Sequence, residues 1–213
     1  MSDFSGNFNE ISELLQKGKA KEIVVSVEKA LADGAEAADI LDKGLISGMN
    51  VVGAKFKNGE IFVPEMLIAA RAMNHATAVL KPVLVESGVE PVGKAIICTV
   101  KGDLHDIGKN LVRMMIEGKG IEVADLGVDC ANDKIVEAVK GSEAKVLCLS
   151  ALLTTTMPAL KDAIEALKTA GIREKVKIMV GGAPVTQGYA TEIGADGYAS
   201  DAASAAEVCR AYY

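Results

Sequence analysis

Short apolar runs that alternate with amphipathic segments occupy the chain from Lys94 onward and constrain its fold more than any other feature. The segments between the runs have the length of helices and end at glycines, as at Gly118, Gly141 and Gly171, and glycine just past the last turn is a common helix stop signal. Continuous apolar strands separated by helices predict a parallel sheet that is covered on both faces. The expected strands are residues 95–100, 123–126, 146–149 and 176–180, with a weaker fifth strand at 197–199.

The residues before this region show helical periodicity only. Ile23 and Val27 follow the spacing of an amphipathic helix, and Pro64 favours the first turn of another. We therefore expect a helical cap domain over residues 1–88 and a Rossmann-like domain over residues 89–213. The predicted fold class is α then α/β, a four-helix bundle followed by a flavodoxin-like, doubly wound parallel sheet of order 2-1-3-4-5. The four helices are expected at residues 8–17, 19–33, 36–56 and 63–86.

Composition argues against several classes of function. The 213-residue chain contains no apolar run as long as a membrane span and no charged-then-apolar leader, which predicts a cytoplasmic protein with no membrane partner. Its formal net charge of -6 argues against nucleic acid as the main partner. The four cysteines show no C-x-x-C pairing, and Cys98 and Cys148 lie within apolar runs. Neither a zinc site nor a disulfide is therefore indicated.

One of the chain's two histidines stands in the loop that follows the first expected strand. Residues 101–109 read Lys-Gly-Asp-Leu-His-Asp-Ile-Gly-Lys, which places Asp103 two residues before His105. A histidine that ligates a metal through one ring nitrogen usually donates its other N–H to a carboxylate, which fixes the tautomer. Asp103 can accept that hydrogen bond, and Gly108 lacks a Cβ that would keep a large planar ligand away. Taken alone, the motif fits a solvated loop histidine as well.

Two further elements end expected strands and favour the metal-ligand interpretation. Residues 150–152, Ser-Ala-Leu, end the third strand, and residues 181–182, Gly-Gly, end the fourth. In an open parallel sheet, ligands bind beyond the carboxyl ends of the strands, where the strand order reverses. We therefore expect both elements and the His105 loop to converge on one edge of the sheet.

In order and spacing, the Asp-x-His-x-x-Gly, Ser-x-Leu and Gly-Gly elements resemble the signature of corrinoid-binding proteins, such as the cobalamin-binding module of methionine synthase. The resemblance implies cobalamin or a related corrinoid as the cofactor, and His105 as the ligand of its cobalt. It also implies that Asp103 is the hydrogen-bond partner of His105, and that Thr156, six positions after Ser150, completes a catalytic relay. Ser150 would contact the displaced nucleotide tail of the cofactor, in a slot lined by the glycine pair.

The helical part of the chain resembles the cap of methyl-transferring corrinoid proteins, through residues 48–56 and 59–73. In that family the cap shields the upper face of the cobalt from water. Candidates for the shielding surface are Phe62, Met66, Leu67, Ala70 and Met73. The full set of cofactor contacts that the resemblance implies is Gly102, Asp103, Leu104, His105, Asp106, Ile107, Gly108, Ser150, Leu152, Leu153, Thr154, Gly181, Gly182, Tyr198, Ala199, Met66 and Met73.

These resemblances imply a non-autonomous corrinoid subunit of a three-component methyltransferase system in methylotrophic metabolism. Such a subunit carries a methyl group on cobalt from a substrate-specific methyltransferase to a second methyltransferase, which acts on tetrahydrofolate or coenzyme M. Donors in this family include methylamines, methanol, betaine and methoxylated aromatics. A reductive activase is a further implied partner.

Two other interpretations stay open at this point. The first is a corrinoid-dependent sensor or regulatory module, since some regulators join a helical bundle to the same binding domain together with a DNA-binding module. The second is a flavodoxin-like signalling domain without a corrinoid. A phosphate-receiving domain of that kind would need an acceptor aspartate at the end of the third strand, where this chain has Ser150.

Overall fold

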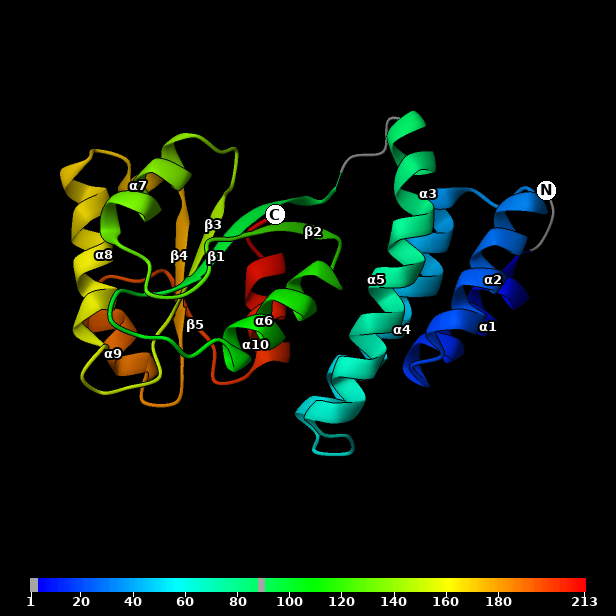
Figure 1. Ribbon diagram of the computed structural model, residues 1–213, viewed down its shortest axis with the longest axis horizontal. Coiled ribbons are helices and arrows are strands. Elements are labelled where there is room, and N and C mark those ends of the chain that lie inside the picture. The colour runs from blue at the N-terminus through cyan, green and yellow to red at the C-terminus, as the bar shows by residue number, and fades with distance from the viewer. Residues whose placement is uncertain (1–3, 88–90) are drawn as a thin grey trace. The chain divides into compact units, whose positions relative to one another are not determined.

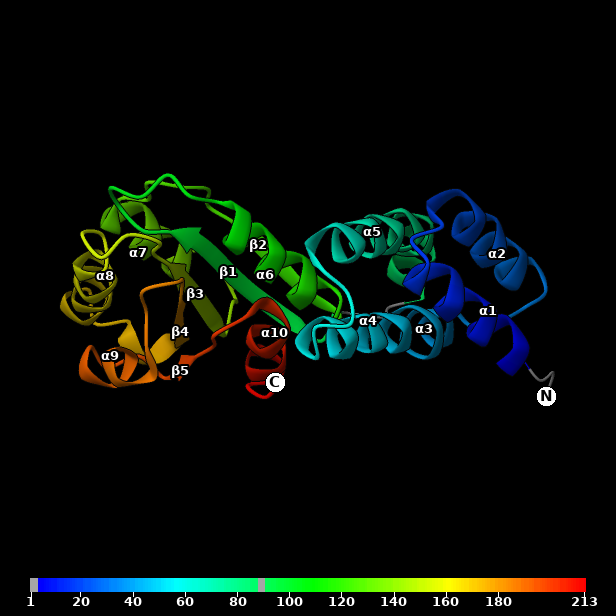
Figure 2. The same ribbon diagram turned by 90° about the horizontal axis from the view of Figure 1, so that it is seen from below.

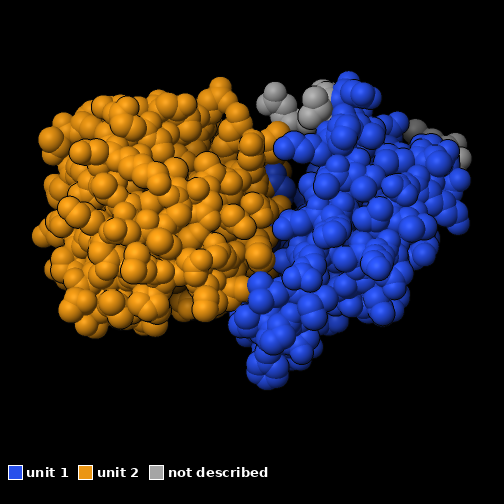
Figure 3. All heavy atoms as spheres, viewed as in Figure 1, with its two compact units in different colours: residues 1–90, 118–120 blue, residues 91–117, 121–213 orange. Residues whose placement is uncertain are grey.

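The computed structural model describes residues 4–87 and 91–213, and the chain forms two compact units (Figures 1 and 3). The first unit consists of residues 1–90 and 118–120, and the second of residues 91–117 and 121–213. The expected domain boundary between residues 88 and 89 lies outside the described residues.

The first unit is helical, as its periodicity predicted. Its core contains the apolar stripes of successive helices, including Ile11, Ile23, Val27, Ile40 and Leu80, all of which are fully buried. The third expected helix is one continuous helical segment, but its middle part has π-helical geometry. The elements are α1 (Ser5–Gln16), α2 (Ala20–Ala32), α3 (Ala37–Asp39), the π-helix η1 (Ile40–Ile46), α4 (Ser47–Lys57) and α5 (Val63–Glu86).

The second unit is a five-stranded sheet in which all neighbouring strands are parallel. The strand order is β2-β1-β3-β4-β5, which confirms the predicted flavodoxin-like topology. The strands are β1 (Gly93–Thr99), β2 (Ile121–Asp125), β3 (Val146–Ser150), β4 (Lys177–Gly181) and β5 (Gly197–Tyr198). The helical elements are α6 (Ile107–Glu117), α7 (Asn132–Lys140), α8 (Pro158–Thr169), the 3-10 turn η2 (Arg173–Lys175), α9 (Gln187–Glu192) and α10 (Ala202–Arg210).

Helices cover both faces of the sheet, as Figure 2 shows: α7, α8 and α9 pack against one face, and α6 and α10 against the other. On the first face, Ile96 and Leu147 of the sheet share a core with Ile135 of α7, Ile164 of α8 and Ile193 of α9. Burial on both faces explains why the strand sequences are continuously apolar and do not alternate with polar residues.

The two C-terminal tyrosines attach the end of α10 to the sheet. The Tyr212 hydroxyl donates to the carbonyl of Asp196 at 3.0 Å, and the Tyr213 hydroxyl donates to the carbonyl of Lys94 at 2.5 Å. Burial raises the pKa of Tyr213 to about 12, so this phenol stays a hydrogen-bond donor at neutral pH.

Across residues 4–87 and 91–213, no helix combines the length and the apolar character that crossing a membrane requires.

Candidate functional site

The three sequence elements meet at the carboxyl edge of the sheet. Thr99, the last residue of β1, pairs in register with Ser150 of β3, and Ser150 pairs with Gly181 of β4. The loops that follow these three strands therefore start side by side. This arrangement brings the His105 loop against the segment after Ser150, as the predicted strand order required.

Asp103 is the centre of the site, and its side chain is fully buried. One carboxylate oxygen, Oδ1, accepts hydrogen bonds from the backbone N–H of His105 at 3.0 Å and from its ring nitrogen Nδ1 at 2.7 Å. The other oxygen, Oδ2, accepts from the backbone N–H of Leu152 at 2.7 Å and from the hydroxyl of Thr156 at 2.7 Å. A longer contact of 3.4 Å joins Oδ2 to the N–H of Leu153. The predicted relay of His105, Asp103 and Thr156 is thus a connected set of hydrogen bonds.

The hydrogen bonds to Asp103 decide its ionisation. Burial by itself raises the pKa of this carboxyl, but the donors from Thr156, His105 and Leu152 together outweigh burial and hold the pKa well below its usual range. Asp103 is therefore a carboxylate at neutral pH and accepts hydrogen bonds only. The Nδ1 atom of His105 must carry the proton in this contact, which leaves Nε2 as the free lone pair of the neutral ring.

The His105 side chain is half exposed, with 50% of its surface accessible, although its partner Asp103 is buried. Apolar side chains lie exposed in the same two loops: Leu104 is 72% and Ile107 73% exposed, and Leu152 and Leu153 are about two-fifths exposed. Exposed large apolar side chains of this kind mark a surface that binds a ligand or a partner. Among these exposed groups, the ring nitrogen Nε2 of His105 can serve as a metal ligand, which the apolar side chains cannot.

The residues at this site fit a metal ion whose other ligands come from a cofactor. Within the parts of the chain that the structure describes, no three His, Cys, Asp or Glu side chains come together as a metal-ligand cluster. A metal at His105 therefore depends on ligands that a cofactor supplies, as the macrocycle of a corrinoid does for cobalt. The exposed apolar side chains beside His105 fit the broad face of such a macrocycle.

The glycine pair allows two backbone segments to approach closely. Gly182 has a φ of +127°, and a Cβ at this position would lie 1.9 Å from the carbonyl oxygen of Ala151. A Cβ on Gly181 would lie 3.3 Å from the carbonyl oxygen of Ala199. Gly182 therefore lets the turn after β4 lie against the loop after β3, and Gly181 faces the segment after β5. The role of the pair as the lining of a nucleotide slot stays a prediction.

The other predicted contacts of the sheet unit differ in their exposure. Ser150 is half-buried at the end of β3, where its carbonyl accepts from the N–H of Val100 at 3.0 Å. Asp106 is exposed, and its side chain accepts from Asn110. Helix α6 begins at Ile107, so Gly108 lies in its first turn. Gly102, Gly108 and Thr154 are exposed, and Tyr198 and Ala199 are half-buried at the end of β5.

The predicted contacts of the helical unit lie on α5. Met66 is fully buried and Met73 is 3% exposed, so both side chains belong to the core of that unit, together with Ala70. Phe62 and Leu67 are exposed. A role of any of these side chains in covering a cofactor stays a prediction.

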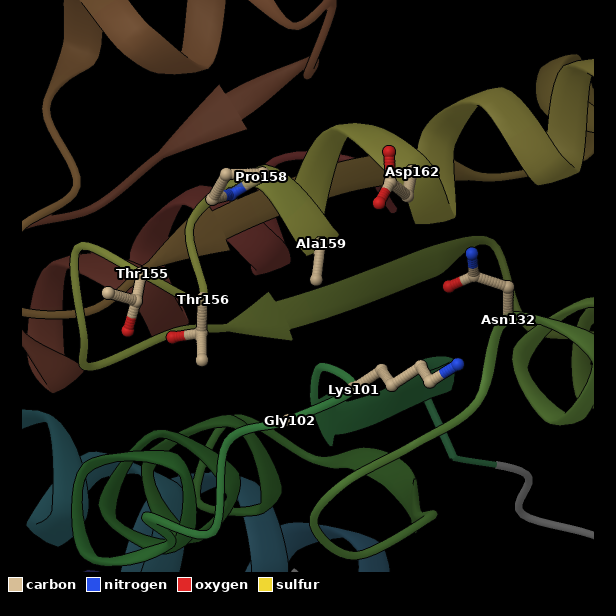
Figure 4. Close-up of a pocket in the computed structure, with 8 residues that line it drawn as sticks. All are labelled: Lys101, Gly102, Asn132, Thr155, Thr156, Pro158, Ala159 and Asp162. Atoms are coloured by element: carbon tan, nitrogen blue, oxygen red, sulfur yellow. The ribbon is translucent and has the colours of Figure 1, made fainter.

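A cavity of about 540 Å³ adjoins the relay, and two of the residues that line it, Gly102 and Thr156, stand in the loops that form the relay. Figure 4 shows that one wall comes from the end of the segment between β3 and α8 and from the first turns of α8, and the other from the loop after β1 and the start of α7. Asp103 and His105 do not line the cavity. The lining residues are Lys101, Gly102, Asn132, Thr155, Thr156, Pro158, Ala159 and Asp162.

The structure adds two residues that sequence patterns did not single out. The hydroxyl of Thr99 donates to the carbonyl of His105 at 2.8 Å, and Asp129 makes two hydrogen bonds to the loop that carries Asp103. The sequence gives only a weak signal for Thr99, which is a threonine at the end of an apolar strand. It gives no signal for Asp129, because Asp129 lies 26 positions after Asp103 and only the pairing of β1 with β2 brings it near.

Comparison with known proteins gives consistent matches over nearly the whole chain. Two family models, both described as a B12 binding domain, match residues 93–207 and 8–81. The dimethylamine corrinoid protein 3 of Methanosarcina acetivorans is 40% identical over 205 residues, which cover 96% of each chain.

Among solved structures, a cobalamin-binding protein from Desulfitobacterium hafniense matches with a TM-score of 0.80 at 31% identity, over 97% of this chain and 98% of that one. A chain of the methanol:cobalamin methyltransferase complex MtaBC from Methanosarcina barkeri matches with a TM-score of 0.85 at 30% identity. That match covers 97% of this chain and 79% of the other.

Proposed function

The chain belongs to the family of corrinoid proteins with a B12-binding domain, and from this membership we propose that it carries a methyl group on a corrinoid whose cobalt is bound by His105. When bound, the corrinoid supplies a cobalt atom that accepts the methyl group and gives it up again. His105 would hold the cobalt, Asp103 would orient the His105 ring, and the apolar side chains of the surrounding loops would exclude water.

The single observation that carries the proposal is the state of His105. Its Nδ1 lies 2.7 Å from the buried Asp103 carboxylate, its side chain is 50% accessible, and the Nδ1–H tautomer leaves the lone pair of Nε2 for a metal. A carboxylate partner of this kind fixes the tautomer and raises the basicity of a metal-bound histidine. Thr156 and the N–H of Leu152 hold the far oxygen of the same carboxylate, so Asp103 cannot turn away from the ring without breaking these hydrogen bonds.

Around this nitrogen, the exposed apolar side chains of Leu104, Ile107, Leu152 and Leu153 provide the contact surface for the corrin ring. Burying them against a macrocycle removes apolar surface from water, which favours binding. The contact also keeps water away from the side of the ring that faces the protein.

We place the protein in a three-component system in the cytoplasm, with methylamines as the class of donor. The support is its 40% identity to a dimethylamine corrinoid protein over nearly the full length of both chains. In this proposal, a substrate-specific methyltransferase loads the methyl group, and a second methyltransferase passes it to tetrahydrofolate or coenzyme M. A reductive activase restores the cofactor after accidental oxidation.

The first experiment reconstitutes the protein with hydroxocobalamin, removes free cofactor by desalting and records the ultraviolet-visible spectrum. We expect the wild type to retain the corrinoid with a histidine-bound spectrum, and His105→Ala to lose that spectrum. His75→Ala is the matched control, because His75 is the chain's other histidine and lies exposed on α5. A wild-type protein that retains no corrinoid, or a spectrum that His105→Ala leaves unchanged, would refute the proposal.

A second experiment addresses the donor. The reconstituted and reduced protein is incubated with dimethylamine and a dimethylamine-specific methyltransferase, or with methanol and a methanol-specific methyltransferase, and methylation is followed spectroscopically. We expect methylation with the dimethylamine pair. Methylation with the methanol pair alone would reject methylamines as the donor class and leave the carrier function in place.

A further inference from the structure

We propose that Asp129, in the loop between β2 and α7, positions the Asp103–His105 pair, and that Thr99 fixes the other end of the same loop. Both residues act through the backbone of the loop that carries His105. The inference rests on the proposed function only for the identity of His105 as a metal ligand. The hydrogen bonds that support it are present in the protein without cofactor.

Asp129 holds the loop on both sides of Asp103. Its carboxylate oxygen Oδ1 accepts from the backbone N–H of Gly102 at 2.7 Å, and its own N–H donates to the carbonyl of Asp103 at 2.9 Å. The first bond involves a charged acceptor and is stronger than a bond between neutral groups. The N–H of Gly102 and the carbonyl of Asp103 are thus held by one residue from a different part of the chain.

The backbone of Asp129 is in the left-handed region, with a φ of +49°, and Asp129 is the one non-glycine residue with a positive φ among residues 4–87 and 91–213. This conformation is unfavourable for most side chains and is tolerated best by Asn and Asp. Residues persist in such conformations where the surrounding contacts hold them there. Here the conformation lets the N–H and the carboxylate of one residue reach the same loop.

Thr99 restrains the loop at His105 itself. Its side chain is fully buried, and its hydroxyl donates to the carbonyl of His105 at 2.8 Å. Its own N–H and carbonyl are paired with Gly127 and Cys130 at 3.0 Å each, so Thr99 is tied to the loop that contains Asp129. The end of β1 and the β2–α7 loop therefore form one frame around the segment from Gly102 to His105.

The function of this frame follows from the geometry of the relay. The Asp103 carboxylate favours the Nδ1–H tautomer only while its oxygen stays within hydrogen-bond distance of the ring. If the loop is released at Gly102 or at the carbonyl of His105, the carboxylate and the ring can move apart. The Nδ1–H tautomer is the one that leaves Nε2 free for a metal, so the frame determines how well His105 is prepared as a ligand.

The experiment measures the tautomer ratio of His105 by the ring 15N chemical shifts of the cofactor-free protein, in alkaline buffer where both rings are neutral. The chain has two histidines, so His105→Ala assigns the signals and His75 is an internal reference. Asp129→Gly keeps the left-handed backbone and removes the carboxylate. We expect it to lower the ratio of the Nδ1–H to the Nε2–H tautomer about threefold to tenfold, the effect of losing one hydrogen bond.

Two further variants separate positioning from general damage. Asp129→Asn keeps both an acceptor oxygen and the tolerance of a positive φ, so we expect its ratio to lie between those of the wild type and Asp129→Gly. Asp133→Asn, an exposed aspartate at the start of α7, removes the same charge nearby and should leave the ratio unchanged. The His75 signals should be the same in all variants, which a merely local role predicts.

A folded Asp129→Gly protein with the wild-type tautomer ratio would overturn the proposal. If Asp129→Gly does not fold, Thr99→Val is measured instead, because it keeps the volume of the side chain and removes the hydroxyl. Thr99→Ser keeps the hydroxyl and should restore the wild-type tautomer ratio. A wild-type ratio in folded Thr99→Val would then overturn it. Failure of the proposed function is a separate result, because it is seen as a wild-type protein that does not retain hydroxocobalamin.

Discussion

Replacing Asp103 by Asn tests the hydrogen-bond arrangement of the site through stability alone. The carboxylate accepts from two backbone N–H groups, those of His105 and Leu152, one on each of its oxygens. An amide has a single oxygen, so its NH2 group must face one of these two fixed donors in either orientation. The Thr156 hydroxyl and the His105 ring can adapt by rotation or by a change of tautomer, but the backbone N–H cannot.

The expected cost follows from this count of hydrogen bonds. A buried donor left without a partner costs about 1–3 kcal/mol, and the remaining bonds lose the strength that a charged acceptor gives them. We therefore expect Asp103→Asn to lower the free energy of unfolding of the sheet unit by about 3 kcal/mol at pH 7. Asp106→Asn is the matched control, because Asp106 is exposed and its side chain accepts a hydrogen bond from its neighbour Asn110 on the surface. We expect a change within about 0.5 kcal/mol.

Urea denaturation followed by tyrosine fluorescence measures this difference. All four tyrosines lie at residues 189–213, in the sheet unit, so the signal reports the unfolding of that unit. The pKa of Asp103 is lower in the folded protein than in the unfolded chain, where it is about 4. The ionised carboxylate therefore stabilises the fold fully above about pH 4, and this stabilisation declines as the pH falls further. The difference between wild type and Asp103→Asn should thus be constant from neutral pH to about pH 5 and shrink in acid. A difference below about 1 kcal/mol at pH 7 would refute the reasoning.

Three further predictions concern the rest of the sheet unit. Gly182→Ala should lower its stability in the same urea assay by at least about 2 kcal/mol, since the new Cβ would collide with the carbonyl of Ala151. Gly188→Ala in α9 should have no destabilising effect, because its Cβ would meet only the Thr186 hydroxyl, at an ordinary contact distance of 3.9 Å. Lys109→Met should lower the free energy of unfolding by about 3 kcal/mol, because Lys109 is buried in an ion pair with Asp125. This is the low end for breaking a buried ion pair, since Arg113 stays beside the same carboxylate. A loss below about 1 kcal/mol would show that the pair is dispensable. All four cysteines are buried and free of disulfide bonds, so a thiol reagent should react with them slowly in the native protein and rapidly with all four in urea. Rapid reaction of the native protein would contradict their burial.

Much of the architecture was predictable because it depends on local patterns. Apolar periodicity changes from helical to strand-like near residue 93, and this change alone predicted a helical unit before a parallel sheet. The order of the strands and the place where their carboxyl ends meet followed from general rules on parallel sheets. The change to π-helical geometry at η1 was not predictable, because it arises inside a segment whose periodicity is helical throughout.

Sequence alone singled out Asp103 and His105 as candidate site residues, because they stand two positions apart and their contact is local. Thr156 was placed in the relay by its spacing from Ser150, and the 2.7 Å contact of its hydroxyl with Asp103 agrees with that placement. Only the tertiary structure decided how Asp103 is held, because its partners come from three strand ends that are distant in the chain. Two of the groups that hold Asp103 give no sequence signal. The backbone N–H of Leu152 is a group that every residue but proline has. Asp129 acts through a left-handed conformation that only the folded loop defines.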